Sequence, residues 1–189
     1  RHLLLIVITQ LLFLQTIVAQ EEPKNNGNSN EPLNYVDVQH YELGLYGGTF
    51  LPFGVVGVRD QYPSVGLWFS HPTGYGGVEY ILNSINAKGV TYFNGSLSLR
   101  VDFKAFDYAN GYFRLGLDAH YYKRKRTVSR EFDFIQTGGS HLGFGLSIGE
   151  GPIAFRSDFK FGFGPGYNLF VNLGVVYRWG TGDKEEGLP

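Results

Sequence analysis

The chain has no cysteine among its 189 residues, which excludes a disulfide framework, a thiolate metal site and a cysteine nucleophile. It also has no surplus of charge: 16 Lys and Arg stand against 17 Asp and Glu, and this balance gives no sign of nucleic-acid binding. Its length suits a single domain with processed ends. Glycine, by contrast, is abundant with 27 residues, and Phe, Tyr and Trp make up 16% of the chain. That composition favours short strands and tight turns over helices.

The first twenty residues have the pattern of an export signal. Arg1 and His2 precede an apolar run over residues 3–14, and the sequence TIVA follows at residues 16–19. A run of this length matches the apolar region of a secretory signal and falls short of the roughly 18 residues of a spanning helix. We therefore predict a cleaved signal peptide over residues 1–19, with a permanent helical anchor as the alternative.

Two further segments are too poor in large apolar side chains to pack. Residues 20–39 are rich in Asn, Glu and Pro, and residues 180–189 are similarly polar. Such segments cannot offset the entropy lost on ordering. We predict a flexible lead over 20–39, a polar tail over 180–189 and a folded part over 40–179.

Within the folded part, apolar and polar side chains alternate with a period of two, which is the signature of β-strands. In residues 154–163 (AFRSDFKFGF), phenylalanines such as Phe155 and Phe161 alternate with Arg156, Asp158 and Lys160. The pattern recurs in residues 41–48, 64–70, 77–84, 93–104, 112–123, 142–148 and 169–179. Gly, Pro, Asn and Asp cluster between segments, at 71–76, 107–111, 150–152 and 164–166. Eight antiparallel strands joined by turns are the predicted result.

Alternation alone leaves open whether the apolar face meets a protein core or lipid. The polar face carries five acids and six bases, Lys104 among the bases. A nearly neutral set suits a water-poor barrel interior, where an unpaired ion costs several kcal/mol. The alternative is the mixed-charge surface of a soluble barrel. We predict a lumen charge network that consists of Glu42, Glu79, Arg100, Asp102, Arg114, Asp118, His120, Arg156, Asp158, Lys160 and Arg178.

The last predicted strand ends in NLGVVYRW, residues 172–179, with Asn172, Gly174, Tyr177 and Trp179 at its defining positions. This pattern resembles the C-terminal assembly signal of bacterial outer-membrane barrels, polar-x-Gly-x-x-apolar-x-aromatic. The resemblance implies recognition by the barrel-assembly machinery during insertion. The chain departs from the family in continuing for ten residues beyond its terminal aromatic side chain.

The first predicted strand, residues 41–48 (YELGLYGG), resembles the opening strand of small OmpA-type and OmpX-type barrels. Over residues 40–179 the resemblance implies an all-β fold, an eight-stranded antiparallel up-and-down transmembrane β-barrel in the cell outer membrane. With both termini periplasmic, as in that family, the connections near 51–62, 85–89, 123–137 and 164–167 would face outside. Eight strands leave an interior that side chains fill, so no open pore is expected.

The strongest candidate for chemistry is the pair Asp118 and His120, two residues apart on one strand face. Eight-stranded barrels that modify lipid A exist, but no serine accompanies this pair at a recognisable spacing. A buried, hydrogen-bonded lumen histidine is therefore the prediction, and no enzyme is expected. Ser140 and His141 form a weaker candidate. The five histidines lack a close acid cluster, so we predict neither a metal site nor a cofactor.

A basic run lies at the outward end of the fifth predicted strand. It consists of Lys123, Arg124, Lys125 and Arg126, with Arg130 beyond it. The run is a candidate contact for lipopolysaccharide phosphates, where each cation would contribute roughly 1 kcal/mol. The alternative is a solvated loop that discourages strand pairing.

These patterns together predict an outer-membrane barrel of structural or surface-interaction type, without an open pore. Its expected partners are outer-membrane lipid, lipopolysaccharide and the barrel-assembly machinery, with no nucleic acid. Two other classes remain open: a lipid A-modifying barrel enzyme and a secreted, lipocalin-like soluble barrel.

Overall fold

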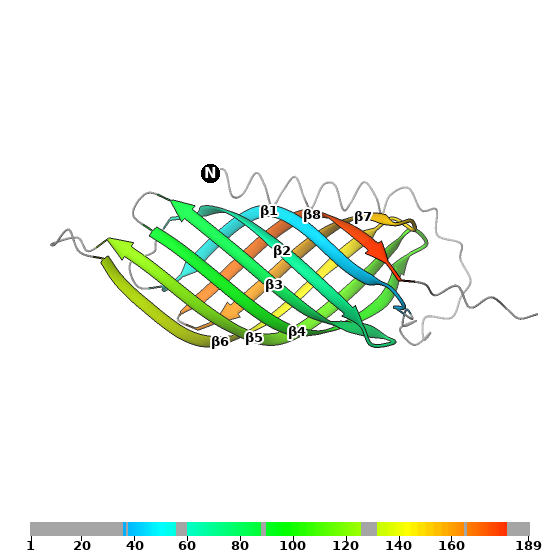
Figure 1. Ribbon diagram of the computed structural model, residues 1–189, viewed down its shortest axis with the longest axis horizontal. Helices are drawn as coiled ribbons and strands as arrows, with labels where there is room; N and C mark the ends of the chain where they lie inside the picture. Colours follow the sequence, from blue (N-terminus) through cyan, green and yellow to red (C-terminus); the bar gives the residue numbers. More distant parts are fainter. Residues whose placement is uncertain are drawn as a thin grey trace, which may run out of the picture. The chain divides into compact units, whose positions relative to one another are not determined.

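The computed structural model describes residue 36 and residues 38–55, 60–87, 90–125, 132–164 and 166–180. Its strands are β1 Tyr41–Phe53, β2 Tyr62–Pro72, β3 Gly76–Ala87, β4 Val90–Phe106, β5 Ala109–Lys125, β6 Phe132–Ile148, β7 Ile153–Phe163 and β8 Tyr167–Trp179. Each strand pairs antiparallel with the next and β8 pairs with β1, so the sheet closes into a barrel (Figure 1). The predicted eight-stranded antiparallel barrel is confirmed. The predicted signal peptide, most of the lead and residues 181–189 of the tail lie outside the described residues.

The two ends of the barrel differ in their connections. Residues 73–75, 107–108 and 149–152 join strands at one end, where Tyr41 also pairs with Trp179; we call this the turn end. Gly74 and Gly149 adopt positive φ values of 90° and 126°, which explains why glycine occupies these turns. The remaining connections belong to the opposite end, the loop end. This separation matches the topology that the sequence predicted.

Several strands are longer than their alternation predicts, and β6 differs most. It begins at Phe132, although the apolar alternation starts only at residue 142. Gly138 and Gly139 erase the pattern there, because glycine shows no preference for either face. The backbone nevertheless pairs with β5 along the whole of β6, from Lys125↔Phe132 to Ala109↔Ile148.

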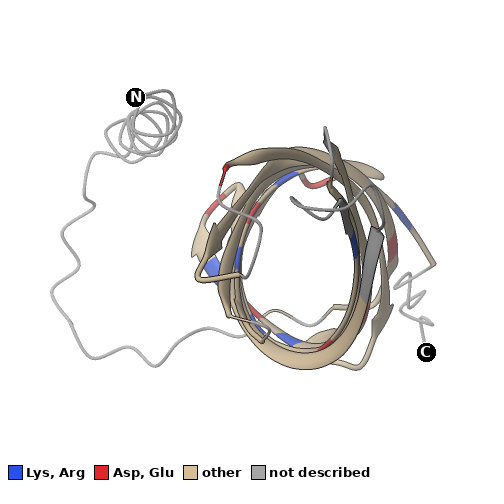
Figure 2. Ribbon diagram, turned by 90° about the vertical axis from the view of Figure 1, so that its left-hand side faces the viewer, with Lys and Arg blue, Asp and Glu red and all other residues tan. Residues whose placement is uncertain are grey.

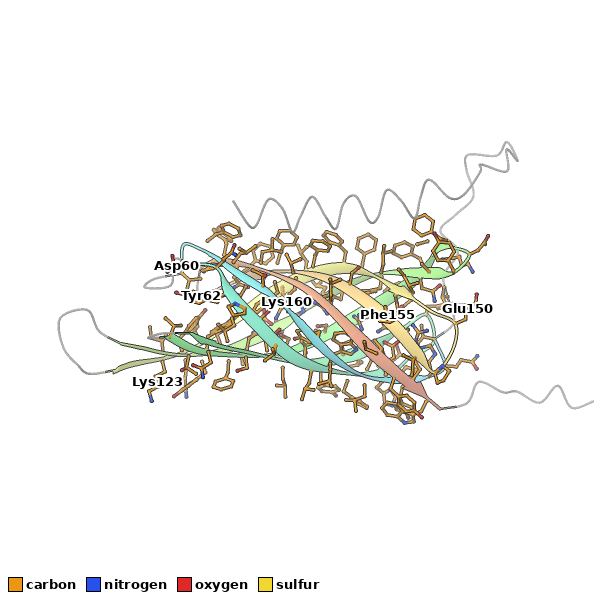
Figure 3. All side chains as sticks on the ribbon, turned by 90° about the horizontal axis from the view of Figure 1, so that it is seen from above. Asp60, Tyr62, Lys123, Glu150, Phe155 and Lys160 are labelled. Atoms are coloured by element: carbon orange, nitrogen blue, oxygen red, sulfur yellow. The ribbon has the colours of Figure 1, made fainter. Side chains whose placement is uncertain are left out.

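The wall of the barrel is apolar on the outside and, away from the loop end, polar on the inside. Leu115 is 68% exposed and Phe155 is 65% exposed, whereas Glu79 is fully buried. Figure 3 shows side chains projecting from the outer wall, and Figure 2, viewed along the barrel, shows acidic and basic positions on strands around the ring. The predicted assignment of apolar residues to one face and charges to the other holds. In the described part of the chain, no helix is long and apolar enough to traverse a lipid bilayer.

Glycines on the inner face make room for large lumen side chains. A Cβ atom at Gly143 would lie 2.6 Å from Nε of Arg114, and one at Gly116 would lie 2.6 Å from Cε1 of His141. Real side chains do not approach this closely. Part of the glycine excess is therefore a packing requirement of the lumen, in addition to its use in turns.

The chain contacts the turn end before β1 begins. The amide of Val38 donates to the carbonyl oxygen of Gly74 at 2.6 Å, and that of Val36 donates to the carbonyl of Asp102 at 3.2 Å. Val38 is also buried. These residues belong to the predicted flexible lead, so ordered contacts start a few residues earlier than the sequence indicates.

Candidate functional site

The inner face of β4 passes through three kinds of environment along the lumen. From the turn end to the loop end, its buried residues are Asp102, Arg100, Ser98, Ser96, Asn94, Tyr92 and Val90. The charged residues belong to a turn-end cluster, made up of Glu42, Glu79, Arg100, Asp102, Arg114, Arg156, Asp158 and Arg178. The polar residues belong to a middle cluster, made up of Asn94, Ser96, Ser98, Asp118, His120, His141 and Lys160. The last two belong to a loop-end core of apolar side chains.

Glu79 stands at the centre of the turn-end cluster. Its Oε1 lies 2.5 Å from Nη1 of Arg156 and 2.8 Å from Nη1 of Arg100, and its Oε2 lies 3.2 Å from Nη1 of Arg114. All four side chains are buried. One carboxylate thus connects cations from three other strands. Removing it would leave Arg156 with only the more distant Oε2 of Glu42, 3.5 Å from its Nη1, in a water-poor interior.

Arg100 extends this network toward the turn end. Besides Glu79 it contacts Oε2 of Glu42 at 2.5 Å and Oδ2 of Asp102 at 2.7 Å. Arg178 of β8 also reaches Glu42, with Nε 3.1 Å from Oε1. The ion pairs therefore connect β1, β3, β4 and β8 across the lumen.

Two aromatic rings and one further acid complete the cluster on the side of β7. Oδ2 of Asp158 accepts from Nη2 of Arg114 at 2.6 Å, and its Oδ1 accepts from the Tyr112 hydroxyl at 2.8 Å. The guanidinium carbon of Arg156 lies 4.1 Å from the ring centre of Tyr112 and 4.8 Å from that of Trp68. Such cation–π contacts stabilise a desolvated guanidinium group that has few hydrogen-bond acceptors.

Asp118 and Lys160 form the ion pair of the middle cluster. Nζ of Lys160, the lysine labelled in Figure 3, lies 2.7 Å from Oδ1 of Asp118. It donates to Oδ1 of Asn94 and Oγ of Ser96, both at 2.5 Å. The ammonium group has three donors and uses all of them here. His120, the candidate partner of Asp118 in the sequence, lies farther away, with Nε2 4.0 Å from Oδ2. Its Nδ1 instead lies 2.8 Å from the hydroxyl of Tyr92.

The structure brings Ser98, His141 and Asp118 together, a grouping that the sequence did not indicate. Nδ1 of His141 lies 3.0 Å from Oδ1 of Asp118, and Nε2 lies 2.8 Å from Oγ of Ser98. With the proton on Nδ1, the nitrogen that faces the carboxylate, Nε2 would accept a hydrogen bond from the serine hydroxyl. The three residues come from β4, β5 and β6, and only the register of these strands aligns them. One sequence feature pointed to this contact: His141 lies two residues before Gly143 and therefore on the same inward face of the predicted strand.

This serine–histidine–aspartate arrangement is buried. Ser98 is 1% exposed, and the side chains of His141 and Asp118 are fully buried. Asp118 also pairs with Lys160, so it does not serve the histidine alone. The arrangement connects three strands and gives the Ser98 hydroxyl a buried partner. Ser140, the serine noted in the sequence, does not belong to the buried set.

Apolar side chains fill the lumen at the loop end. This loop-end core consists of Phe50, Val55, Ile85, Val90, Tyr92, Tyr122 and Phe170. Its rings stack closely, with 4.4 Å between the centres of Tyr92 and Tyr122 and 4.8 Å between those of Phe50 and Phe170. Ile135 and Tyr62 pack against it.

All eleven residues of the predicted lumen network face the barrel interior, and the described ion pairs join them in two separate groups, one in the turn-end cluster and one in the middle cluster. Lys104 does not join them, since it is exposed and its Nζ donates to the carbonyl oxygen of Asp107. Without Lys104, five acids and five Lys or Arg residues remain, so the network is neutral when its histidines are neutral.

The residues of the predicted assembly signal occupy both faces of β8. Asn172 is buried in the lumen, and a Cβ at Gly174 would meet the Trp68 ring. Tyr177 and Trp179 lie on the outer face with 5.9 Å between ring centres. Trp179 also stacks on Tyr41, at 5.8 Å, across the junction of β8 and β1.

The predicted basic run lies at the loop end, where β5 ends at Lys125. Lys123 is on the outer face of β5 (Figure 3), and Arg126 and Arg130 lie outside the described residues. In the described segments between residues 36 and 180, no group of three or more His, Asp or Glu residues could hold a metal ion.

Neither a family model nor a curated protein sequence matches the chain. Solved structures do. The N-terminal β-barrel domain of Pseudomonas aeruginosa OprF matches with a TM-score of 0.62 at 13% identity, covering 76% of this chain and 100% of that one. The chain has the fold of a small outer-membrane β-barrel. Neisserial surface protein A gives a TM-score of 0.61 at 11% identity, over 76% of this chain and 99% of that one. Ail of Yersinia pestis, in complex with the heparin analogue sucrose octasulfate, gives 0.52 at 12% identity, over 74% and 98%.

Proposed function

We propose that the protein is an integral outer-membrane barrel of structural or surface-interaction type, exported through a cleaved signal peptide and without an open pore. The observation that carries this proposal is the inverted wall, with leucine and phenylalanine side chains outside and ion pairs inside. A soluble monomer rarely exposes a contiguous apolar patch larger than a few hundred Å². A bilayer would cover the apolar wall of this barrel.

The lipocalin-like alternative requires the opposite arrangement of faces. A soluble barrel of that type keeps apolar residues inside, where its ligand binds, and polar residues outside. Here the described lumen holds Glu79, Arg156 and their partners, while Leu115 and Phe155 point outward. This arrangement of faces supports a membrane barrel over a lipocalin-like soluble barrel.

A closed lumen follows from the three layers of side chains. The turn-end cluster, the middle cluster and the loop-end core succeed one another along the barrel. Ions would have to break buried pairs and displace packed rings to pass. We therefore propose that the protein conducts no steady ionic current in its native state.

The proposal also excludes enzymatic activity on lipid A. Such an enzyme needs its nucleophile where an acyl chain or sugar in the membrane reaches it. Ser98, the one serine described in contact with a histidine, points into the packed lumen instead.

Two partners belong to the proposal. The barrel-assembly machinery would recognise the aromatic end of β8. Lipopolysaccharide phosphates would bind the basic run beginning at Lys123. Ail supports the second partner only by showing that a barrel of this fold can bind a polyanion, sucrose octasulfate.

Membrane integration is tested by fractionation and gel mobility. The expected result is that the protein stays with outer membranes after alkaline carbonate washing and migrates differently before and after boiling. A monomer soluble without detergent would overturn the proposal. Planar-bilayer recording checks the closed lumen, and a reproducible porin-like conductance would refute that part.

A further inference from the structure

The middle cluster brings an amine against a carboxamide from another strand. Nζ of Lys160, on β7, donates to Oδ1 of Asn94, on β4, at 2.5 Å, although β4 and β7 do not pair with each other. Nδ2 of Asn94 lies 3.4 Å from the carbonyl oxygen of Ala119, so the carboxamide turns its carbonyl group toward the lysine. A carbonyl bond is about 1.2 Å long, which places Nζ no more than about 3.7 Å from Cγ of Asn94. Atoms poised to react are about 3–3.5 Å apart, so the amine is close to attacking distance.

Asp118 supplies the base that such an attack requires. Its Oδ1 lies 2.7 Å from Nζ of Lys160, and both side chains are buried. An ammonium group has no free electron pair and becomes a nucleophile only when a neighbouring base takes a proton from it. In a water-poor lumen the two charges lack the hydration that would stabilise them, so transfer of this proton costs less than it would in water. The transfer leaves a neutral amine facing Asn94.

Two donors are available to the carbonyl oxygen of Asn94 on which negative charge would develop. Nδ2 of Asn83 donates to Oδ1 at 3.0 Å. Oγ of Ser96 lies 3.0 Å from the same oxygen and 2.5 Å from Oδ1 of Asp118. Its single hydrogen can turn to Asn94 once Asp118 has taken a proton. Donors already aimed at a developing oxyanion lower the barrier to nucleophilic addition.

We propose that Lys160 and Asn94 form an amide bond, an autocatalytic cross-link between β7 and β4 inside the lumen. Nζ passes a proton to Asp118 and adds to Cγ of Asn94, and the electron pair of the C=O bond moves onto Oδ1. In this intermediate Nζ and Nδ2 are bonded to the same carbon, so the carboxyl group beside Nζ is next to Nδ2 as well.

The bond to Nδ2 of Asn94 then breaks and the C=O bond forms again. Asp118 relays two protons from Nζ to Nδ2, which leaves with the electron pair of the broken bond as ammonium. Nζ keeps its third proton in the new amide, and Asp118 ends as a carboxylate. The reaction needs no oxidant and no co-reactant. Because Asn94 and Lys160 are 66 residues apart and the other groups come from β3 and β5, the site exists only in the folded barrel.

Tryptic peptide mass spectrometry of the full chain, folded into lipid vesicles, tests the cross-link. Trypsin cuts after Lys and Arg, so the bond should join residues 89–100 to residues 157–178, with no cleavage after Lys160 and one ammonia missing. Most folded molecules should carry this linked pair, and its absence would overturn the proposal. Loss of ammonia without a linked pair, as in cyclisation at Asn94 and Gly95, would also overturn it. A link from Lys160 to Asp118, which loses water instead, would have the same consequence.

A time course shows whether the folded site makes the bond. The chain held in urea should lack the linked pair, which should accumulate only after boiling-dependent gel mobility shows a folded barrel. Equal amounts in the unfolded chain would refute catalysis by the site. Asp118→Asn should slow formation of the bond about 100-fold, the usual scale for loss of a general base. An unchanged rate in that variant would overturn the role of Asp118.

Gel mobility after boiling gives a second readout. Lys160→Arg keeps the positive charge but removes the amine, and Lys104→Arg is the matched control because Lys104 is exposed. The boiled wild type and Lys104→Arg should migrate alike and faster than boiled Lys160→Arg, since a cross-linked chain cannot extend fully. Identical migration of the three boiled proteins would refute the cross-link.

Discussion

Replacing Glu79 by glutamine changes the charge at the centre of the lumen while keeping the size of the side chain. Each carboxylate oxygen faces at least one arginine donor, Arg100 and Arg156 at Oε1 and Arg114 at Oε2. In glutamine one of these oxygens becomes an NH₂ group, which would point a donor at a donor. Breaking a buried ion pair by removing one partner destabilises by about 3–5 kcal/mol, so a loss in this range is expected.

The free energy of unfolding is measured by urea titration of the protein folded into lipid vesicles, with gel mobility reporting the folded fraction. Glu150→Gln is the matched control, because Glu150 is exposed in a turn (Figure 3) and the same change there should stay within about 0.5 kcal/mol. Adding Arg156→Met to Glu79→Gln restores neutrality and should recover part of the loss. If Glu79→Gln and Glu150→Gln had equal effects, the lumen would be hydrated and the reasoning would be wrong.

Three further predictions concern the outer face, the lumen glycines and assembly. Leu117 lies at the centre of the outward apolar row of β5, so Leu117→Arg should weaken the barrel in vesicles by about 2–4 kcal/mol if this position is near the bilayer midplane. The control is Ile153→Arg at the barrel end, which should cost about 0–1 kcal/mol. Equal small losses in the two variants would contradict lipid contact. Gly143→Ala should destabilise by about 1–3 kcal/mol in the same urea titration, because its Cβ meets Arg114, whereas Gly95→Ala, on the open outer face, should be neutral or stabilising. Alanine at both aromatic positions of the assembly signal should lower the folded barrel recovered from outer membranes without reducing export, and normal recovery would show that the signal lies elsewhere.

The strand faces were predictable because alternation survives wherever large side chains occupy both faces. In β7, Phe155 and Phe161 point outward while Arg156, Asp158 and Lys160 point inward, as the sequence indicates. The near neutrality of the charges was predictable for the same reason. The sequence wrongly placed Lys104 among the lumen bases. The alternation of apolar and polar residues continues to the end of β4, but there the side chain is already in solvent.

Contacts between strands were less predictable, because they depend on register. Ser98 and His141 are forty-three residues apart in sequence and meet only through the pairing of β4 with β5 and of β5 with β6. The outer half of β6 was missed because Gly138 and Gly139 carry no side chains to show a period. Likewise, the role of Gly143 depends on the position of Arg114 on the neighbouring strand.

The pairing of β1 with β8 has a consequence for how the barrel folds. Seven of the eight strand pairs join neighbours in sequence, but Tyr41↔Trp179 joins residues at opposite ends of the folded part. Local pairs form quickly, whereas a contact of this sequence separation must first overcome the entropy of closing a long loop. Until it does, the chain is an open sheet with two unpaired edges, prone to pair with other chains. The time that the chain spends as an open sheet depends on a single step, the pairing of β1 with β8. The stacked rings of Tyr41 and Trp179 stabilise the closed barrel that this step forms.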